Sequence, residues 1–392
     1  MKSTIDVRTT PPVFLPGTSR LTRFLILISV LFGIPGGYTA VNAVAGELAT
    51  AMSLEEMRQN VAAASVVSPP WDGPTQGPKA SAGRTIAIIN EDLRNGGILG
   101  VAQGIREAVQ VLGWKVRMFD AGGTLAGRKK AAAQALDADP DGVILNGADA
   151  SIMAPFLSPL VQQHIPIVGW HVGPKAGVME QGGIVMNVST DPLDVARVTA
   201  MAAIVAAKGE AGVVIFTDSN FEIALAKSEA MAEVIKSCQK CTLLEVRDLA
   251  ISDSARLMPT VSRNLLKRYG KRWTHALAIN DIYFDYAVPE FILAGPEAQN
   301  VEFLSAGDGS SAAYVRILAG SFQVGTVAEP LNLQGWQLVD ELNRLMEGQP
   351  PSGYVAPVHL ITPENAEYDG GADYHYDPAN GYRDVYRRIW GR

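Results

Sequence analysis

The sequence predicts an α/β protein built from two units, each a parallel sheet covered by helices on both faces. From Arg84 onward, short apolar runs alternate with segments of helical spacing, which is typical of parallel strands joined by helices. The alternation starts afresh after about residue 190, so two units of similar size follow one another. The chain has 392 residues, 47% of them hydrophobic, which is enough for two domains with extensions.

The first unit is expected to alternate strands with helices. Each strand is a short apolar run, and each helix repeats its apolar residues every three to four positions. Gly113 follows the first helix as a C-terminal cap. The expected strands are 85–90, 114–120, 140–147, 165–170 and 182–189, and the expected helices are 96–113, 125–138 and 151–164.

The second unit repeats the alternation with one irregularity, because Pro289 must lie at a turn or kink of its helix. The expected strands are 211–218, 242–248, 275–280, 301–307 and 322–328. The expected helices are 192–209, 221–238, 253–269, 283–295, 310–320 and 332–348.

The N-terminal segment has the features of an export signal. Arg20 and Arg23 precede an apolar run over 24–34, and residues 43–45 (Ala-Val-Ala) have the small-x-small form of a signal-peptidase site. The run is shorter than the roughly 20 residues that a membrane helix needs. We therefore expect residues 1–45 to be a cleaved signal peptide.

Two further segments flank the expected fold. Residues 46–83 are a poor core segment, in which 52–64 could form a short helix and the rest is rich in Pro, Gly and Ser. We expect an extended arm that leads into the fold. Residues 363–392 are expected to form a C-terminal tail.

Cys238 and Cys241 form an isolated C-x-x-C motif, which can be a redox site, half of a zinc site or a small-loop disulfide. The chain has no second cysteine pair for a four-cysteine zinc site. A redox motif should open a helix directly after a strand, whereas this one follows helix 223–235 and precedes strand 242–246. With an export signal, a structural disulfide is expected, and two unpaired thiols are the alternative.

Several segments together carry a family resemblance: "IAIINEDLRNGGILGVAQGIREAVQVLGWKV", "PDGVILNGADASIMAPFLSPLVQQHIPIVGWHV", "AINDIYFDYAV", "LSAGDGS" and "GTVAEPLNLQGW". In their order and spacing, the chain resembles the type I periplasmic binding proteins, in particular the ribose-binding-protein-like sugar group. The resemblance covers about residues 84–362. It implies two Rossmann-like lobes joined by a three-segment hinge.

The resemblance also implies how the chain divides between the lobes. The first lobe is expected to combine 84–189 with 329–362, and the second to span 190–328. The three crossovers are expected near 187–191, 308–311 and 328–331.

Polar residues follow the predicted strands of the first lobe, and ligands of open parallel sheets bind beyond the carboxyl ends of the strands. The family pattern places Glu91 and Asn95 toward the ligand, while Ile98 stands where ribose-like binders carry an aromatic residue. Trp170 and His171 end the fourth strand. Because an imidazole can donate or accept a hydrogen bond, we expect both to line the cleft, with core packing as the alternative for Trp170. Other polar residues at strand ends are Asn90, Asp92, Asp218, Ser219 and Asp281.

The second lobe is expected to supply the other half of the site. Lys227 stands where the family usually has an arginine, and Asn280 and Asp308 match the family pattern. Glu329 replaces the usual amide at the end of the next strand. Lys227 could instead be solvated, and Asp308 could instead cap the helix that follows it.

Aromatic residues of the second lobe could supply an apolar face for a sugar ring. Tyr283 and Phe284 are candidates, because the aromatic platform near Ile98 is missing. Since both begin a helix, one of them is expected to belong to the core.

Charge and motifs argue against two other classes of function. The formal net charge is −7 and the basic residues form no stripe, so no nucleic-acid partner is expected. The sequence contains neither GxSxG nor HExxH. Glu91, Asp308 and Glu329 could supply a glycosidase pair, but lobes that close around a whole ligand leave no side for a leaving group. We therefore expect no enzyme, no cofactor and no metal.

These features favour an exported receptor that captures a sugar or sugar alcohol by hinge closure. The expected partner is an ABC importer permease, and the expected state is a periplasmic monomer. The alternative is an exported sensor that presents its ligand to a membrane chemoreceptor or kinase. A regulator of the lactose-repressor type would need a DNA-binding head before Arg84, where the signal and the arm lie instead.

The export signal can be tested directly. Because an arginine-flanked apolar run precedes the small-x-small site, the mature protein should begin after about residue 45. N-terminal sequencing of protein from the periplasm checks this. A protein that begins at Met1, or that stays attached to the membrane, contradicts it.

Overall fold

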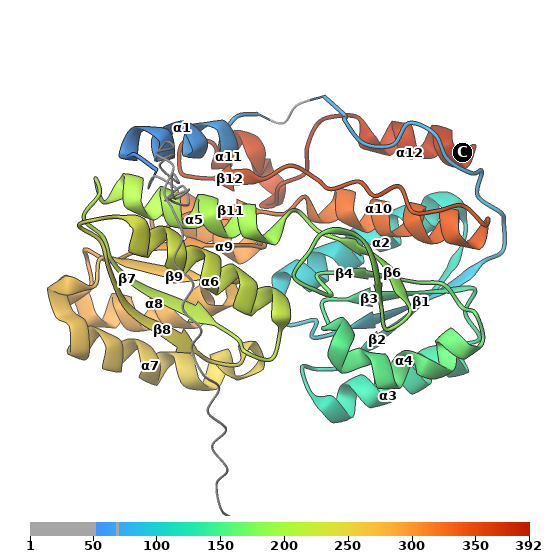
Figure 1. Ribbon diagram of the computed structural model, residues 1–392, viewed down its shortest axis with the longest axis horizontal. Helices are drawn as coiled ribbons and strands as arrows, with labels where there is room; N and C mark the ends of the chain where they lie inside the picture. Colours follow the sequence, from blue (N-terminus) through green and yellow to red (C-terminus); the bar gives the residue numbers. More distant parts are fainter. Residues whose placement is uncertain (1–51, 68–69) are drawn as a thin grey trace, which may run out of the picture. The chain divides into compact units, whose positions relative to one another are not determined.

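Two six-stranded sheets organise the computed structural model of the protein, which describes residues 52–67 and 70–392 (Figure 1). The predicted signal peptide over 1–45 lies outside the described residues. We call the first sheet with its helices the first lobe, and the second sheet with its helices the second lobe. This arrangement confirms the predicted α/β class.

The first sheet has the strand order β2-β1-β3-β4-β6-β5 and is parallel except for β5, which runs antiparallel to β6. Its inner strands are continuous apolar runs because helices cover both faces. Its strands are β1 (Thr85–Asn90), β2 (Lys115–Asp120), β3 (Gly142–Asn146), β4 (Ile167–Trp170), β5 (Gly177–Gln181) and β6 (Ile184–Val188). Sequence analysis did not predict β5, which lies at the sheet edge and alternates buried with exposed residues.

The second sheet has the order β12-β11-β10-β9-β7-β8, and only β12 is antiparallel to its neighbour. Its strands are β7 (Gly212–Thr217), β8 (Thr242–Asp248), β9 (His275–Ala278), β10 (Glu302–Ser305), β11 (Gln323–Ala328) and β12 (His359–Ile361). In both sheets the parallel strands direct their carboxyl ends to one edge, where ligands of such folds bind.

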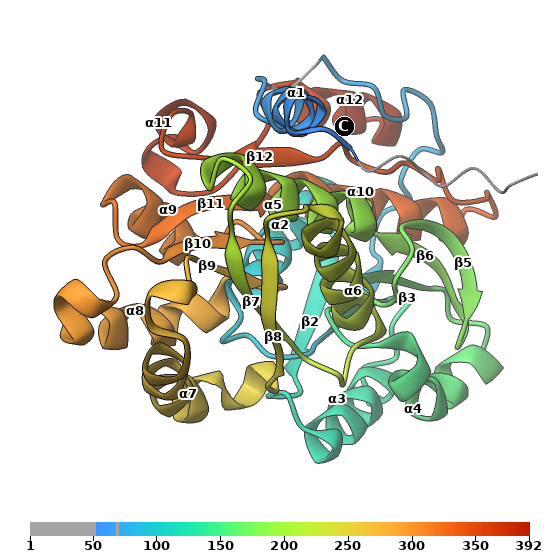
Figure 2. The ribbon, with the colours of Figure 1, turned by 60° about the vertical axis from the view of Figure 1, so that its left-hand side comes forward.

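Helices pack on the sheets through their apolar faces. In the first lobe, α2 (Gly96–Leu112) and α10 (Leu331–Met346) pack together in one core cluster, while α3 (Leu125–Asp137) and α4 (Ala150–Gln162) form another. In the second lobe, α5 (Pro192–Ala206) packs with α6 (Glu222–Ser237), and α7 (Ser254–Tyr269) with α8 (Ile282–Ala294) (Figure 2). Helix α9 (Ser311–Leu318) lies on β11.

Two crossovers lie where they were predicted, and the third does not. The chain passes to the second lobe between β6 and α5, and it returns between β11 and α10. The prediction of a crossover at 308–311 is wrong, because β10, α9 and β11 all belong to the second lobe. The third passage is the segment 347–358, which leads from α10 to β12.

Strand β12 also corrects the expected division of the chain between the two lobes. Residues 329–362 were expected to lie in the first lobe, but Leu360 of β12 pairs with Val327 of β11 in the second sheet. The sequence offers little warning, because a three-residue strand is too short to show any periodicity.

The described parts of the N-terminal arm (52–67 and 70–83) and the C-terminal segment 363–392 pack on the two lobes. Helix α1 (Leu54–Ala64) packs against α5 and β12 of the second lobe, while Trp71 joins the core of the first lobe. The expected tail contains α11 (Ala366–Asp369) beside α9, and then α12 (Tyr382–Trp390), which packs on α10. The N-terminal arm and the C-terminal segment meet where the backbone N–H of Ala80 donates to the Trp390 carbonyl over 3.1 Å.

Cys238 and Cys241 form a disulfide with an S–S distance of 2.06 Å, in the turn between α6 and β8. The predicted pairing is therefore present. No helix among the described residues is long and apolar enough to cross a membrane.

Candidate functional site

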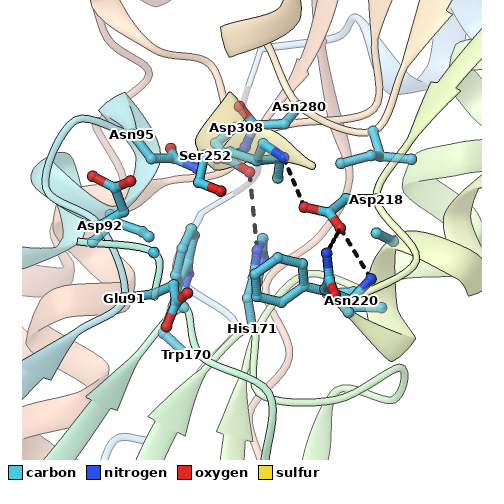
Figure 3. Close-up of a pocket in the computed structure, with 18 of the residues that line it drawn as sticks. Glu91, Asp92, Asn95, Trp170, His171, Asp218, Asn220, Ser252, Asn280 and Asp308 are labelled. Atoms are coloured by element: carbon cyan, nitrogen blue, oxygen red, sulfur yellow. Dashed lines mark hydrogen bonds and ion pairs between the residues drawn. The ribbon is translucent and has the colours of Figure 1, made fainter. Parts of the chain in front are cut away.

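The carboxyl ends of the two sheets face each other across a cavity of about 290 Å³ (Figure 3). This volume is at the lower end of the range of about 300–1,000 Å³ for small-molecule sites. Of the ten residues expected at the site, eight line the cavity: Glu91, Asn95, Ile98, Trp170, His171, Lys227, Asn280 and Asp308. Tyr283 and Glu329 do not.

Trp170 and His171 form the floor on the side of the first lobe. Their rings are stacked, with centroids 3.7 Å apart and an interplanar angle of 8°. Trp170 is both a core residue and a lining residue, and its indole N–H donates to Gln334 Oε1 on α10 over 2.7 Å. His171 has a φ of 51°, a left-handed conformation that few non-glycine residues adopt.

Glu329 lies behind His171 rather than in the cavity. Its Oε1 is 3.1 Å from His171 Nε2, and its Oε2 accepts a hydrogen bond from the backbone N–H of Thr190 over 3.0 Å. Burial opposes its ionisation, but His171, Lys227 and Gln334 together lower the pKa of the Glu329 carboxyl to about 2. The prediction that Glu329 lines the site is therefore corrected, because the crossover after β11 turns this side chain toward the hinge.

Asp308 and Asn280 come from the second lobe. The Asn280 amide donates to Asp308 Oδ2 over 2.6 Å, and Asp308 Oδ1 lies 3.9 Å from His171 Nδ1. Burial raises the pKa of Asp308 to about 6, although His171 and Lys227 oppose this shift. Asp308 does not cap α9, since Ser310 occupies the N-cap position and its side chain accepts from the Ala313 amide.

Lys227 is buried on α6 and not solvated, with 2% of its surface exposed. Its ammonium donates to the Ala306 carbonyl over 2.7 Å. An ammonium has three N–H donors, so Lys227 has hydrogen-bonding capacity left for a ligand.

Tyr283 and Phe284 both belong to the core of the second lobe. The Tyr283 hydroxyl donates to the Leu249 carbonyl over 2.7 Å, and Phe284 stacks on Phe303 with centroids 4.7 Å apart. The prediction that Tyr283 supplies an apolar face to the ligand is therefore wrong. The first turn of α8 faces the sheet, not the cavity, and buries both rings.

Sequence analysis missed Arg128, which pairs with Glu91 inside the cavity. Arg128 Nε lies 2.8 Å from Glu91 Oε2, and Nη2 lies 2.5 Å from Oε1. Burial raises the pKa of Glu91 even though the guanidinium opposes the shift. A signal was present: Arg128 is on the buried face of α3 with Ala131, Ala132 and Ala135, and a buried cation requires a partner.

Asp92 and Asp218, which were expected among the polar strand-end residues, also line the cavity, together with residues that were not predicted to form the site. Asp218 at the end of β7 accepts hydrogen bonds from the backbone amides of Asn220 and Ile251 over 2.9 and 2.7 Å. Phe221 lies before the first turn of α6, with the Arg128 guanidinium 5.7 Å from its ring centroid. The remaining lining residues, which were not predicted to form the site, are Gly123, Leu125, Gly147, Asn220, Ile223, Ala224, Ile251, Ser252 and Ile279.

The two lobes touch at both sides of the cavity. A Cβ atom added to Gly97 on α2 would lie 2.1 Å from Asp308 Oδ2. The backbone N–H of Glu222 donates to Asp149 Oδ2 over 3.0 Å, so α6 and α4 also meet. The lobes are therefore closed over the cavity.

The described residues contain no group of three or more His, Cys, Asp and Glu side chains arranged to hold a metal ion. The polar groups of the cavity come instead as amides, carboxylates, an imidazole and two cationic side chains, with apolar Ile98, Phe221 and Trp170 between them. Such a site can hold a small molecule with several hydrogen-bonding groups.

Comparison with solved structures shows the same fold in sugar-transport proteins. A sugar ABC transporter protein from Yersinia enterocolitica subsp. enterocolitica 8081 superposes with a TM-score of 0.65 at 16% identity, over 83% of this chain and 99% of that chain. A solute binding protein from Agrobacterium vitis with bound allitol gives 0.62 at 18%, over 73% and 97%. A Caulobacter myo-inositol binding protein bound to myo-inositol gives 0.62 at 17%, over 74% and 96%.

No curated protein matches the chain. The sequence model of one protein family, described as the periplasmic binding protein domain, matches residues 86–350 of this chain. These residues contain most of both lobes and all of the cavity residues. The chain therefore belongs to the periplasmic binding protein domain family, whose members are non-enzymatic binding proteins.

Proposed function

We propose that the protein is an exported solute receptor that captures one small sugar or sugar alcohol between its lobes and delivers it to an ABC importer. The observation that carries the proposal is the closed cavity, which polar side chains enter from both lobes. A ligand that bonds to both lobes favours the closed state over the open one. Hinge closure is thus the binding step.

The side chains of the cavity suit a largely neutral, polyhydroxylated ligand. The cation of Arg128 is already paired with Glu91, and Lys227 is the remaining cation of the lining. Asp308 and Asn95 add acceptors and donors nearby. A hydroxyl both donates and accepts, so a polyol can satisfy such a mixed set without bringing a net charge into the cavity.

The proteins with bound allitol and myo-inositol support this class of ligand, because they share the fold. The family match supports a periplasmic location. The alternative of an exported sensor uses the same closed form, and gene neighbours encoding a permease and an ATPase, or a sensor kinase, distinguish the two. We propose that the binding unit is a monomer.

A thermal-shift screen tests the proposal. The panel comprises pentoses, hexoses, sugar alcohols including allitol, myo-inositol and amino sugars. We expect at least one neutral polyol to raise the melting temperature, because a ligand that binds only the folded state stabilises it. A panel in which only charged compounds stabilise the protein would overturn the proposed ligand class.

Asp308→Ala should weaken binding of the best ligand in the screen by about tenfold to a hundredfold. Loss of one partner of a buried hydrogen bond costs about 1–3 kcal/mol, and 1.4 kcal/mol is about tenfold in affinity. Calorimetry measures the loss, with Asp384→Ala as the control, because the Asp384 side chain on α12 is 74% exposed. Unchanged binding by Asp308→Ala would place the ligand elsewhere.

Asp308→Asn should stabilise the unliganded protein at pH 8 but not at pH 4. Burial raises the pKa of Asp308 from 3.8 to about 6, so the folded state disfavours the carboxylate. The resulting destabilisation is absent below the unfolded pKa and complete above the folded pKa. Two pKa units correspond to at most about 3 kcal/mol. Denaturant unfolding at both pH values measures it, and an equal effect at both would refute the pKa shift.

Gly97→Ala should hinder closure without damaging either lobe. The added methyl group would lie 2.1 Å from Asp308 Oδ2 across the interlobe contact, while alanine favours the helix that begins there. We expect weaker ligand binding at an unchanged or higher melting temperature of the unliganded protein. Calorimetry and melting curves decide, and full affinity in this variant would show that the lobes need not approach so closely.

A further inference from the structure

His171 lies between two carboxyl groups that come from different parts of the fold. Glu329 Oε1 is 3.1 Å from its Nε2, on the side of the hinge. Asp308 Oδ1 is 3.9 Å from its Nδ1, on the side of the second lobe. Of these three residues, Asp308 and His171 line the cavity and Glu329 does not. The two ring nitrogens therefore face different surroundings.

Glu329 accepts the hydrogen bonds of its two amide neighbours. The backbone N–H of Thr190 and the side-chain amide of Gln334 both donate to Oε2. An ionised carboxylate fits this pattern, because it has no proton to donate. The remaining contact, to His171 Nε2, must then have the imidazole as the donor.

The ring of His171 has little freedom to turn away from this contact. It stacks on Trp170 at 3.7 Å, and the Trp170 indole is held in turn by Gln334 Oε1 at 2.7 Å. Gln334 thus contacts both Trp170 and Glu329. The side chains of α10 and of the crossover form one network that fixes the imidazole plane.

We propose that Glu329 is a positioning residue that selects the Nε2–H tautomer of the uncharged His171 ring, so that in this form the unprotonated Nδ1 faces the cavity as a hydrogen-bond acceptor beside Asp308. The inference deepens the proposed function, on which its consequence for the ligand rests. The partner of a ring nitrogen commonly sets which nitrogen carries the proton.

This arrangement determines which ligand group fits between the lobes. A ligand group beside an unprotonated Nδ1 must carry a proton to bond with it, as a hydroxyl does and an ether or carbonyl oxygen does not. A hydroxyl has a single proton, so it donates to Nδ1 rather than to Asp308 Oδ1, which lies 3.9 Å away. The hydroxyl oxygen can accept in turn from the Asn280 amide, which already lies 2.6 Å from Asp308 Oδ2. The site thus selects a free hydroxyl at this position.

The tautomer can be measured on the unliganded protein by long-range ¹H–¹⁵N NMR of the imidazole rings. The sequence has only five histidines, so His171→Gln assigns the signals. At about pH 8, where an ordinary imidazole is neutral, we expect a protonated Nε2 and a non-protonated Nδ1 in His171. In Glu329→Gln this preference should weaken, and both nitrogen signals should move toward the average of exchanging tautomers.

Asp369→Asn is the matched control, because Asp369 Oδ2 lies 3.0 Å from Nε2 of His359, a second buried histidine outside the cavity. This variant should alter the His359 signals and leave those of His171 unchanged. A wild-type His171 with a protonated Nδ1, or signals unchanged in a folded Glu329→Gln, would overturn the proposal. If Glu329→Gln does not fold, the wild-type spectrum alone decides. Since no ligand is needed, the result is independent of whether the polyol screen succeeds.

Discussion

Burial of charged and polar groups between two lobes is the constraint on which the rest of the structure depends. A buried charge is tolerated only when it is paired and hydrogen-bonded. Glu91 meets Arg128 within the first lobe, and Lys227 meets the Ala306 carbonyl within the second. Each of these two charged groups therefore has a hydrogen-bonding partner within its own lobe. The hydrogen-bonding capacity that remains is available to a ligand in the cavity.

The hinge is built to hold this arrangement in place. The crossover after β11 brings Glu329 to His171, and the crossover after β6 brings the Thr190 amide to the same carboxylate. Glu329 of one crossover thus contacts His171, which lines the cavity, and Thr190 of the other crossover contacts Glu329. These hydrogen bonds connect the hinge to the site.

The described flanking segments (52–67, 70–85 and 351–392) extend the fold beyond residues 86–350, which match the family model. Trp71 packs against Tyr354 at 5.0 Å and Tyr386 at 5.5 Å, which joins the N-terminal arm to α12. Helix α1 and β12 meet on the second lobe, while α12 covers α10 on the first. The two terminal segments therefore contact both lobes on the side where the chain crosses between them.

Periodic and strand-end patterns predicted much of this molecule, because they reflect local physics. Apolar runs such as Ile86–Ile89 must be buried on both faces, and polar residues that end such strands, such as His171 and Asp308, must lie at the binding edge. The edge strands β5 and β12 were not predicted, and a strand as short as β12 cannot show a periodic pattern.

Side-chain direction could not be predicted at the hinge or at helix starts. Glu329 ends a strand as expected, but a crossover turns it away from the cavity, and the first turn of α8 sends Tyr283 into the core. Arg128 on a helix face of the first lobe contacts Phe221 at the start of α6 in the second lobe. Such contacts between distant segments leave no local pattern.

Ligand-driven closure shortens the distance between the lobes, and this distance can be measured. Spin labels on Lys129→Cys in α3 and Ala255→Cys in α7 report this distance, because both positions are exposed and on different lobes. The native cysteines are paired in a disulfide and do not react. Pulsed electron–electron double resonance measures the distribution of distances between the two labels. We expect a broad distribution at longer distances without ligand, and a narrow one at shorter distances with a polyol that the thermal screen identifies. The same distribution with and without a bound polyol would contradict the account.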